Sequence, residues 1–261
     1  MGNQENDEKK LEYIRAGEDI RLKNPHHIPV AASIQEANDL YHWAQEDKEA
    51  LSAYGLVWEL VEDLPARLEA LSKAEALWQT QWLDRQQRSQ EWNELSQLAY
   101  DLRNRLLVDF RYAFRNHPAL LKPLKSSERR KSHPKMIQDL NDLSVLGLAN
   151  RQLLEAIRFD MSLLEKAAQT SVEMSALLAK TITSRMELGS AKTKRDQVYT
   201  YLKDAVDEIR RTGRYVFRRN KVRYRGYISD HLRQTKIRQA RKLKEKQEPS
   251  QPTMKITTKT Q

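Results

Sequence analysis

Arginine, lysine and tyrosine are concentrated in the last fifth of the chain, and these residue types are suited to binding anions. From Arg210 onwards there are 17 Lys and Arg against 3 Asp and Glu, whereas the preceding 209 residues hold 29 and 33. Such cations neutralise phosphates or carboxylates, and tyrosines among them could stack on unpaired bases. The candidate binding residues are Arg210, Arg211, Arg214, Tyr215, Arg218, Arg219, Lys221, Arg223, Tyr224, Arg225, Arg233, Lys236, Arg238, Arg241 and Lys242.

An acidic macromolecule is the partner that this segment predicts. No known nucleic-acid reader motif accompanies the cations, so binding to nucleic acid should show little sequence preference. Other interpretations stay open: an acidic protein, an anionic membrane surface, or a basic tail that is only solvated. The main alternative is a homo-oligomer, in which the mildly acidic body of one copy pairs with the basic segment of another.

Residues for catalysis or metal binding are scarce, so we expect neither an enzyme nor a cofactor. The chain has no cysteine, which excludes thiolate chemistry. It has no glycine-rich phosphate loop and no serine in a strand–turn–helix setting. A carboxylate-bridged metal site in a helical bundle needs paired Glu-x-x-His motifs, and the nearest match is a single Asp39-Leu40-Tyr41-His42.

The composition is that of long helices. Of the 261 residues 39% are apolar and 31% charged, with only 7 Gly and 8 Pro. Few turn-forming residues among many good helix formers predict an all-α fold. No stretch approaches 18 apolar residues, and the N-terminus lacks the apolar core of a signal peptide. We therefore expect a cytoplasmic protein without a transmembrane segment.

A five-residue motif occurs twice, 103 residues apart. Arg111-Tyr112-Ala113-Phe114-Arg115 recurs as Arg214-Tyr215-Val216-Phe217-Arg218. At the same offset Leu51 coincides with Leu154, and further apolar positions coincide in the same way. The repeat indicates two similar helical units, arising from an ancestral duplication or from shared bundle geometry. The motif itself could bind phosphates or bases, or it could finish and cap a helix.

Apolar residues recur at helical spacing over two long stretches. These predict two helical hairpins, 47–116 and 150–219, with coiled-coil-like packing into an elongated antiparallel four-helix bundle. The turns are expected at 85–89 and at Gly189-Ser190. Pro65 should kink or split the first helix because proline removes a backbone donor.

Local signals define the remaining segments. Ser33 and Glu36 have capping-box spacing, which predicts a helix from 33 to 45. A short helix from Lys135 to Leu146 should end at Gly147, and a last helix should begin at Ser229. The predicted organisation is a flexible polar arm 1–32, a bundle 33–219 with a linker 117–149, a basic segment 220–246, and a disordered tail 247–261.

Overall fold

The computed structural model describes residue 22 and residues 28–128 and 132–247, and every regular element in these ranges is a helix. The all-α prediction is therefore confirmed. The described residues fall into two compact units: the first unit takes residues up to Ala76 and from Thr193 onwards, and the second unit takes Leu77–Lys192. The predicted arm before residue 28 and the predicted tail from residue 248 lie outside the described residues.

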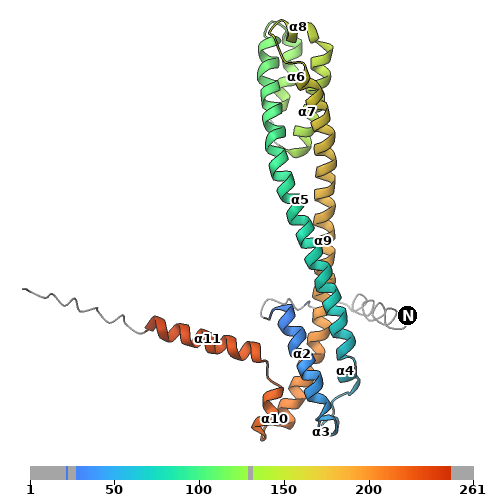
Figure 1. The fold of residues 1–261 in the computed structure, drawn as a ribbon, viewed down its shortest axis with the longest axis vertical. Helices are drawn as coiled ribbons and strands as arrows, with labels where there is room; N and C mark the ends of the chain where they lie inside the picture. The colour runs from blue at the N-terminus through green and yellow to red at the C-terminus, as the bar shows by residue number, and fades with distance from the viewer. Residues whose placement is uncertain (1–21, 23–27, 129–131, 248–261) are drawn as a thin grey trace, which may run out of the picture. The chain divides into compact units, whose positions relative to one another are not determined.

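The first unit packs short helices against the ends of two long ones (Figure 1). Its core joins Leu40, Leu51 and Leu71 to Leu202 and Ile209, which are all at most 2% exposed. Its elements are α2 (Val30–Gln45), α3 (Lys48–Ala53), α4 (Glu59–Glu62), the start of α5 (Leu64–Ala113), the end of α9 (Ser162–Val216), α10 (Lys221–Gly226) and α11 (Asp230–Gln247).

The second unit has its own core. Phe110 and Phe114 are fully buried there with Leu140, Leu154 and Leu164. Its elements are the rest of α5, α6 (Pro118–Glu128), α7 (His133–Ala149), α8 (Arg151–Glu155) and the start of α9 (Figure 1).

The predicted turns inside the hairpins are wrong. Residues 85–89 lie within the 50-residue helix α5, and Gly189-Ser190 lies within the 55-residue helix α9. The Arg and Gln residues of the first segment are good helix formers. A single glycine costs a helix only about 1 kcal/mol, too little to end one that is packed elsewhere. Pro65 splits its helix as expected, because α4 ends before it and it becomes the second residue of α5.

Two predicted helix boundaries also differ from the structure. Helix α2 begins at Val30, with Pro29 at the N-cap, and Ser33 caps nothing. The capping box fails because tertiary partners bind the Glu36 carboxylate. Gly147 lies inside α7 and not after it. A Cβ there would come within 2.7 Å of Phe110 and Leu164, so close packing and not helix termination explains this glycine.

The sequence spacing of Leu95, Leu98, Leu102 and Leu106 predicts an apolar stripe along the second half of α5, but the first part of this stripe lies on the exposed side of the helix. Leu95 and Leu98 are 41% and 65% exposed. The buried line runs through Trp92, Ser96 and Ala99 and joins the predicted stripe at Leu106. A serine and an alanine carry little hydrophobic signal, so the neighbouring leucines gave the stronger but misleading pattern.

Helix boundaries recur at the 103-residue offset of the repeated motif. The starts of α2, α3, α4 and α6 are each followed 103 residues later by the starts of α7, α8, α9 and α10, and α5 and α9 end 103 residues apart. The described residues with positive φ, Gly55 and Arg158, are also separated by 103. Each unit combines the first helices of one half of the chain with the last helices of the other half.

Side-chain volumes compensate between equivalent positions of the two units. Gly213 is equivalent to Phe110, and Tyr227 is equivalent to Leu124. A Cβ on Gly213 would lie 2.1 Å from the Tyr227 ring, and that ring is fully buried and stacks on Phe217 at 5.6 Å. The larger ring at one position therefore requires glycine at the other.

We expect Gly213→Ala to lower the free energy of unfolding by about 1–3 kcal/mol, because the buried ring cannot move aside without overpacking. The matched control is Gly189→Ala, also inside α9, where a Cβ would meet nothing within 4 Å. The control should raise the free energy of unfolding by up to about 1 kcal/mol, through helix propensity alone. Urea unfolding followed by circular dichroism measures both, and equal effects would contradict the packing argument.

Candidate interaction surface

The repeated Arg-Tyr-x-Phe-Arg motif ends a long helix in both units. Arg115 donates from Nη1 to the Tyr112 carbonyl at 2.8 Å and lies over the Tyr112 ring, 4.5 Å from its centroid. Arg218 does the same to Tyr215, at 2.8 Å and 4.6 Å. The last carbonyls of a helix have no intrahelical donor, and a cation there also favours the helix dipole. This geometry supports the helix-capping interpretation of the motif.

Arg210 belongs to a buried ion pair. Its Nη2 donates to Glu36 Oε2 at 2.9 Å, and both side chains are at most 15% exposed. Glu36 Oε1 accepts from the Ser229 hydroxyl at 3.0 Å and from the His231 amide at 2.7 Å. One carboxylate on α2 thus binds α9 and the first turn of α11.

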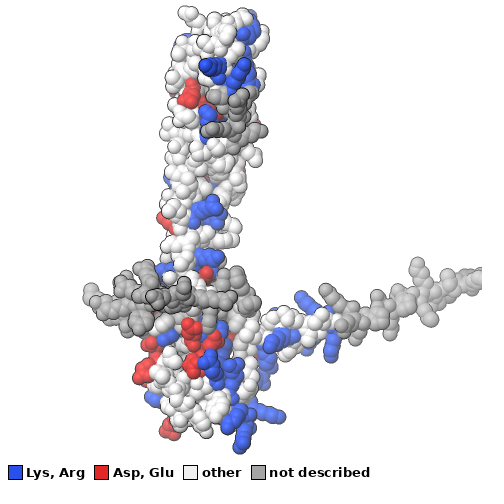
Figure 2. Space-filling model, turned by 180° about the vertical axis from the view of Figure 1, so that it is seen from behind, with Lys and Arg blue, Asp and Glu red and all other residues white. Residues whose placement is uncertain are grey.

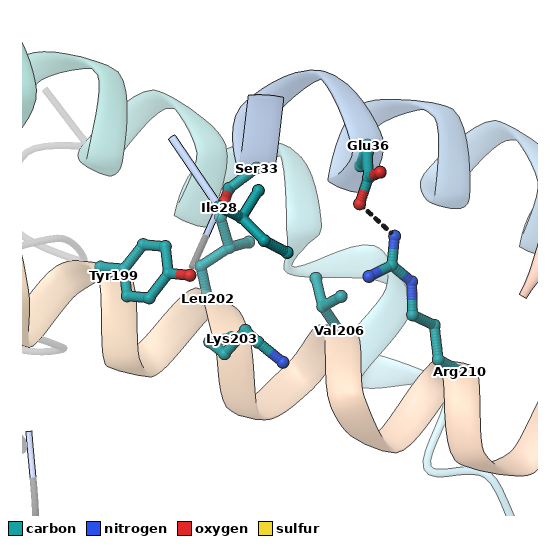
Figure 3. A pocket seen from close by; sticks show the side chains of 8 residues that line it. All are labelled: Ile28, Ser33, Glu36, Tyr199, Leu202, Lys203, Val206 and Arg210. Atoms are coloured by element: carbon teal, nitrogen blue, oxygen red, sulfur yellow. Dashed lines mark hydrogen bonds and ion pairs between the residues drawn. The ribbon is translucent and has the colours of Figure 1, made fainter. Parts of the chain in front are cut away.

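A pocket beside this ion pair is too small for a ligand (Figure 3). Its volume is ≈ 20 Å³, and it is lined by residues of α2 and α9 together with Ile28. Ser33 Oγ and Arg210 Nε are buried beside it without a hydrogen-bond partner. The space is about that of one water molecule.

Arg223 is the second candidate residue that is held by its own chain. It pairs with Asp47 Oδ2 at 2.6 Å and with Glu46 Oε2 at 2.8 Å, and its guanidinium lies over the Trp43 ring at 4.2 Å. Burial works against the charge, but the two carboxylates keep the pKa of Arg223 above its usual value. A charge satisfied in this way is not available to a partner.

Tyr227 completes this network. Its hydroxyl donates to Asp47 Oδ2 at 2.6 Å. Burial and the adjacent Asp47 carboxylate raise the pKa of Tyr227 far above that of a free tyrosine. The hydroxyl therefore stays protonated and donating, and α10 remains fixed to α2 and α3.

The other candidate cations lie on the surface. Arg211 and Arg233 have acidic neighbours three residues away on their own helices. Arg218 donates to the Tyr215 carbonyl, as described above. The remaining cations have no ion-pair or hydrogen-bond partner among the described residues. Figure 2 shows Lys and Arg along helix α11 and over the adjacent end of the first unit. The unpartnered set is Arg214, Arg219, Lys221, Arg225, Lys236, Arg238, Arg241, Lys242 and, beyond the predicted residues, Lys244.

The candidate tyrosines are less available than the cations. Tyr215 is 57% exposed, but Arg218 covers its ring and Tyr54 contacts it edge-on at 5.8 Å. Tyr224 is half-buried. Stacking of bases on these rings would require the covering residues to move, so the surface acts chiefly through charge.

A groove lies between the end of α9 and the start of α11. Its volume is ≈ 370 Å³. Ile28, Ile228 and Leu232 form its apolar part. Of the cations that line it, Arg214 and Lys236 have no partner among the described residues, whereas Lys203 pairs with Asp207. Two members of the unpartnered set therefore lie together in the groove at the base of α11.

Comparison with known proteins gives no relative. No family model, curated protein or solved structure matches the chain. Among the described residues no helix is long and apolar enough to cross a membrane. In the same ranges no three His, Cys, Asp or Glu residues are grouped to hold a metal ion.

The sequence presents the basic segment as one set of cations, but in the structure two distant carboxylates divide it. Glu36 and Asp47 hold Arg210 and Arg223, which are 174 and 176 residues away in the chain. No local pattern around Glu36 or Asp47 indicates these distant partners. Nothing in the spacing of the cations distinguishes the buried ones from the exposed ones.

We expect Glu36→Gln to lower the free energy of unfolding at pH 7 by about 1–3 kcal/mol, because it leaves Arg210 buried without a counter-ion. Burial alone would raise the pKa of Glu36, but the bonds from His231, Arg210 and Ser229 hold it below its usual 4.5. Glu36 therefore stabilises the fold above pH 4.5, and this contribution disappears as the pH falls through the lowered pKa.

Urea unfolding of the wild type and of Glu36→Gln at pH 7 and pH 3 tests this prediction. The difference in free energy of unfolding between the two proteins should be smaller at pH 3 than at pH 7. Glu208→Gln is the control, since Glu208 makes only an exposed pair with Arg211 and should change stability by less than about 0.5 kcal/mol. An equal difference in free energy of unfolding at both pH values would show that the charge of the Glu36 carboxylate is not the source of the stability.

Proposed function

We propose that the protein is a non-catalytic binding protein that captures an acidic macromolecule through the exposed cations of its first unit. The observation that carries this proposal is the division of the basic segment. Arg210 and Arg223 are bound internally, whereas nine cations from Arg214 to Lys244 have no partner among the described residues. Self-repulsion of such a cluster is relieved by a polyanion, with release of the polyanion's counter-ions.

The helical body serves in this proposal as a support. We infer that the chain consists of two tandem sequence repeats, which differ from the two compact units described above. Helix boundaries, positive-φ residues and buried leucines recur at the same 103-residue offset. The two repeats differ in the residues that hold the basic segment to the rest of the first unit. The positions equivalent to Asp47, Arg223 and Tyr227 hold Asn150, Leu120 and Leu124.

Self-assembly through acidic body and basic segment is less well supported. The carboxylates best placed to bind the segment, Glu36, Glu46 and Asp47, already bind Arg210 and Arg223 of the same chain. These pairs leave fewer acidic groups for a second copy.

We expect the combined change of Arg238, Arg241, Lys242 and Lys244 to Gln to weaken binding to acidic polymers at least tenfold at 50 mM salt. These side chains are exposed on α11 and contact no core residue, so the fold should persist. The measurement is fluorescence anisotropy with labelled duplex DNA, heparin and polyaspartate at two salt concentrations. Deletion from Arg210 is unsuitable, because it would also remove Tyr227 from the core.

The matched control changes Lys166, Lys180, Arg185 and Lys192 to Gln. These four are exposed on α9 in the second unit, and their loss alters the net charge equally. The control should bind like the wild type. If both variants lose the same affinity, binding reflects net charge alone, and if the wild type binds none of the polymers, the proposed function is wrong.

A further inference from the structure

Beyond its first two turns, helix α11 is exposed to solvent and has no packing partner among the described residues. Its first turn is fixed by Ser229, whose hydroxyl accepts from the Leu232 amide at 3.2 Å, and by Glu36. From Lys236 to Lys244 every side chain is exposed. Most helical stability in proteins comes from packing, and α11 carries five cations between these two residues as well. A helix of this kind is completed by a partner that supplies negative charge.

The cations do not cover α11 evenly. At 3.6 residues per turn, Thr235, Gln239 and Leu243 fall on one side of the helix, and this side carries no charge between Arg233 and Lys244. Cations stand on both flanks of this uncharged face. Arg238 and Lys242 lie on one flank, and Lys236, Arg233 and Lys244 lie on the other. Arg241 lies opposite the uncharged face, so the cations from Arg233 to Lys244 are spread over about two thirds of the circumference.

This arrangement matches a helix lying in a groove between two rows of phosphates. The major groove of B-form DNA is about 12 Å wide and admits an α-helix. The base edges would face Thr235, Gln239 and Leu243, and the two backbones would face the flanking cations. Glutamine is suited to the edge of adenine, and leucine and threonine methyl groups to the methyl group of thymine.

Other acidic partners fit less well. A membrane surface binds one side of a helix and requires a broad apolar face opposite the charges, whereas Leu232 and Leu243 are the large apolar residues near the uncharged face of α11. A flat acidic protein surface would leave one cationic flank in water. The major groove of double-stranded RNA is deep and narrow and excludes a helix.

The first unit holds further cations near the start of α11. Arg214 and Lys236 line the groove between α9 and α11, and Lys221 and Arg225 are exposed on α10. Since Glu36 fixes the first turn of α11 to α2, these residues can contact phosphates beside the site that α11 occupies. They would add affinity without sequence information.

We propose that the acidic partner is duplex DNA, with α11 lying in the major groove through its Thr235–Gln239–Leu243 face. This proposal rests on the proposed function and goes beyond it by naming the class of partner and the element that enters it. Base contacts are limited to few residues, so affinity comes mainly from phosphates, and the sequence preference is modest.

The first experiment compares full-length protein on a 30-base-pair DNA duplex and on the RNA duplex of the same sequence, by anisotropy between 50 and 200 mM salt. We expect at least tenfold tighter binding to DNA. Replacement of Arg238, Arg241, Lys242 and Lys244 by Gln should make the plot of log association constant against log salt concentration less steep, by about 3 to 4 in slope. The control with four Gln replacements on α9 should leave the slope unchanged.

The second experiment separates an inserted helix from a solvated basic tail. Ala240→Pro interrupts α11 at an exposed position and removes no charge, because proline breaks a helix interior. We expect at least a tenfold loss of DNA affinity. The control Ala240→Gly keeps every backbone donor and should lose less, and circular dichroism shows whether the rest of the fold is unchanged.

The outcomes distinguish the two proposals. Tighter binding to DNA that depends on an intact α11 supports major-groove insertion. Equal binding to DNA, RNA, heparin and polyaspartate, or no effect of Ala240→Pro, overturns the inference and leaves the proposed function standing. No binding to any of these polymers overturns both.

Discussion

The Glu36 carboxylate is the interaction on which the organisation of the first unit depends. It lies on α2 and binds Arg210 of α9, the Ser229 hydroxyl and the His231 amide. A carboxylate withdrawn from water is stable only when its oxygens are bonded and its charge is balanced. Both oxygens of Glu36 meet this requirement by joining three helices, and the base of α11 is thereby fixed.

Comparison with the second unit separates the ion pair that both units contain from the contacts that only the first unit has. There Asp139 of α7 is fully buried and pairs with Arg103 of α5 at 2.7 Å and with Lys135. In both units, then, a carboxylate on the short helix holds an arginine on the long one. The Asp47–Arg223–Tyr227 network has no such equivalent, because leucines stand at the positions of Arg223 and Tyr227. Since apolar side chains serve there, this network is specific to the end that carries the basic segment.

Burial divides the basic segment into two classes of residue with different roles. Arg210 and Arg223 stabilise the first unit and position α10 and α11. The nine unpartnered cations make no ion pair or hydrogen bond with the described residues, and they cost stability through mutual repulsion. In the function that we propose, a partner of opposite charge relieves this repulsion, and the uncharged face of α11 lies in a groove of that partner.

The all-α class and the division of the helix at Pro65 followed from the sequence, because helix propensity and proline act within a few positions of themselves. The 103-residue repeat also followed from sequence comparison within the chain. The uninterrupted course of α5 through residues 85–89, the start of α2 and the burial of Ala99 instead of Leu98 did not. Only the tertiary structure decided which cations are free, since Glu36 and Asp47 lie more than 170 residues from the arginines they bind, and no local pattern encodes a contact at that distance.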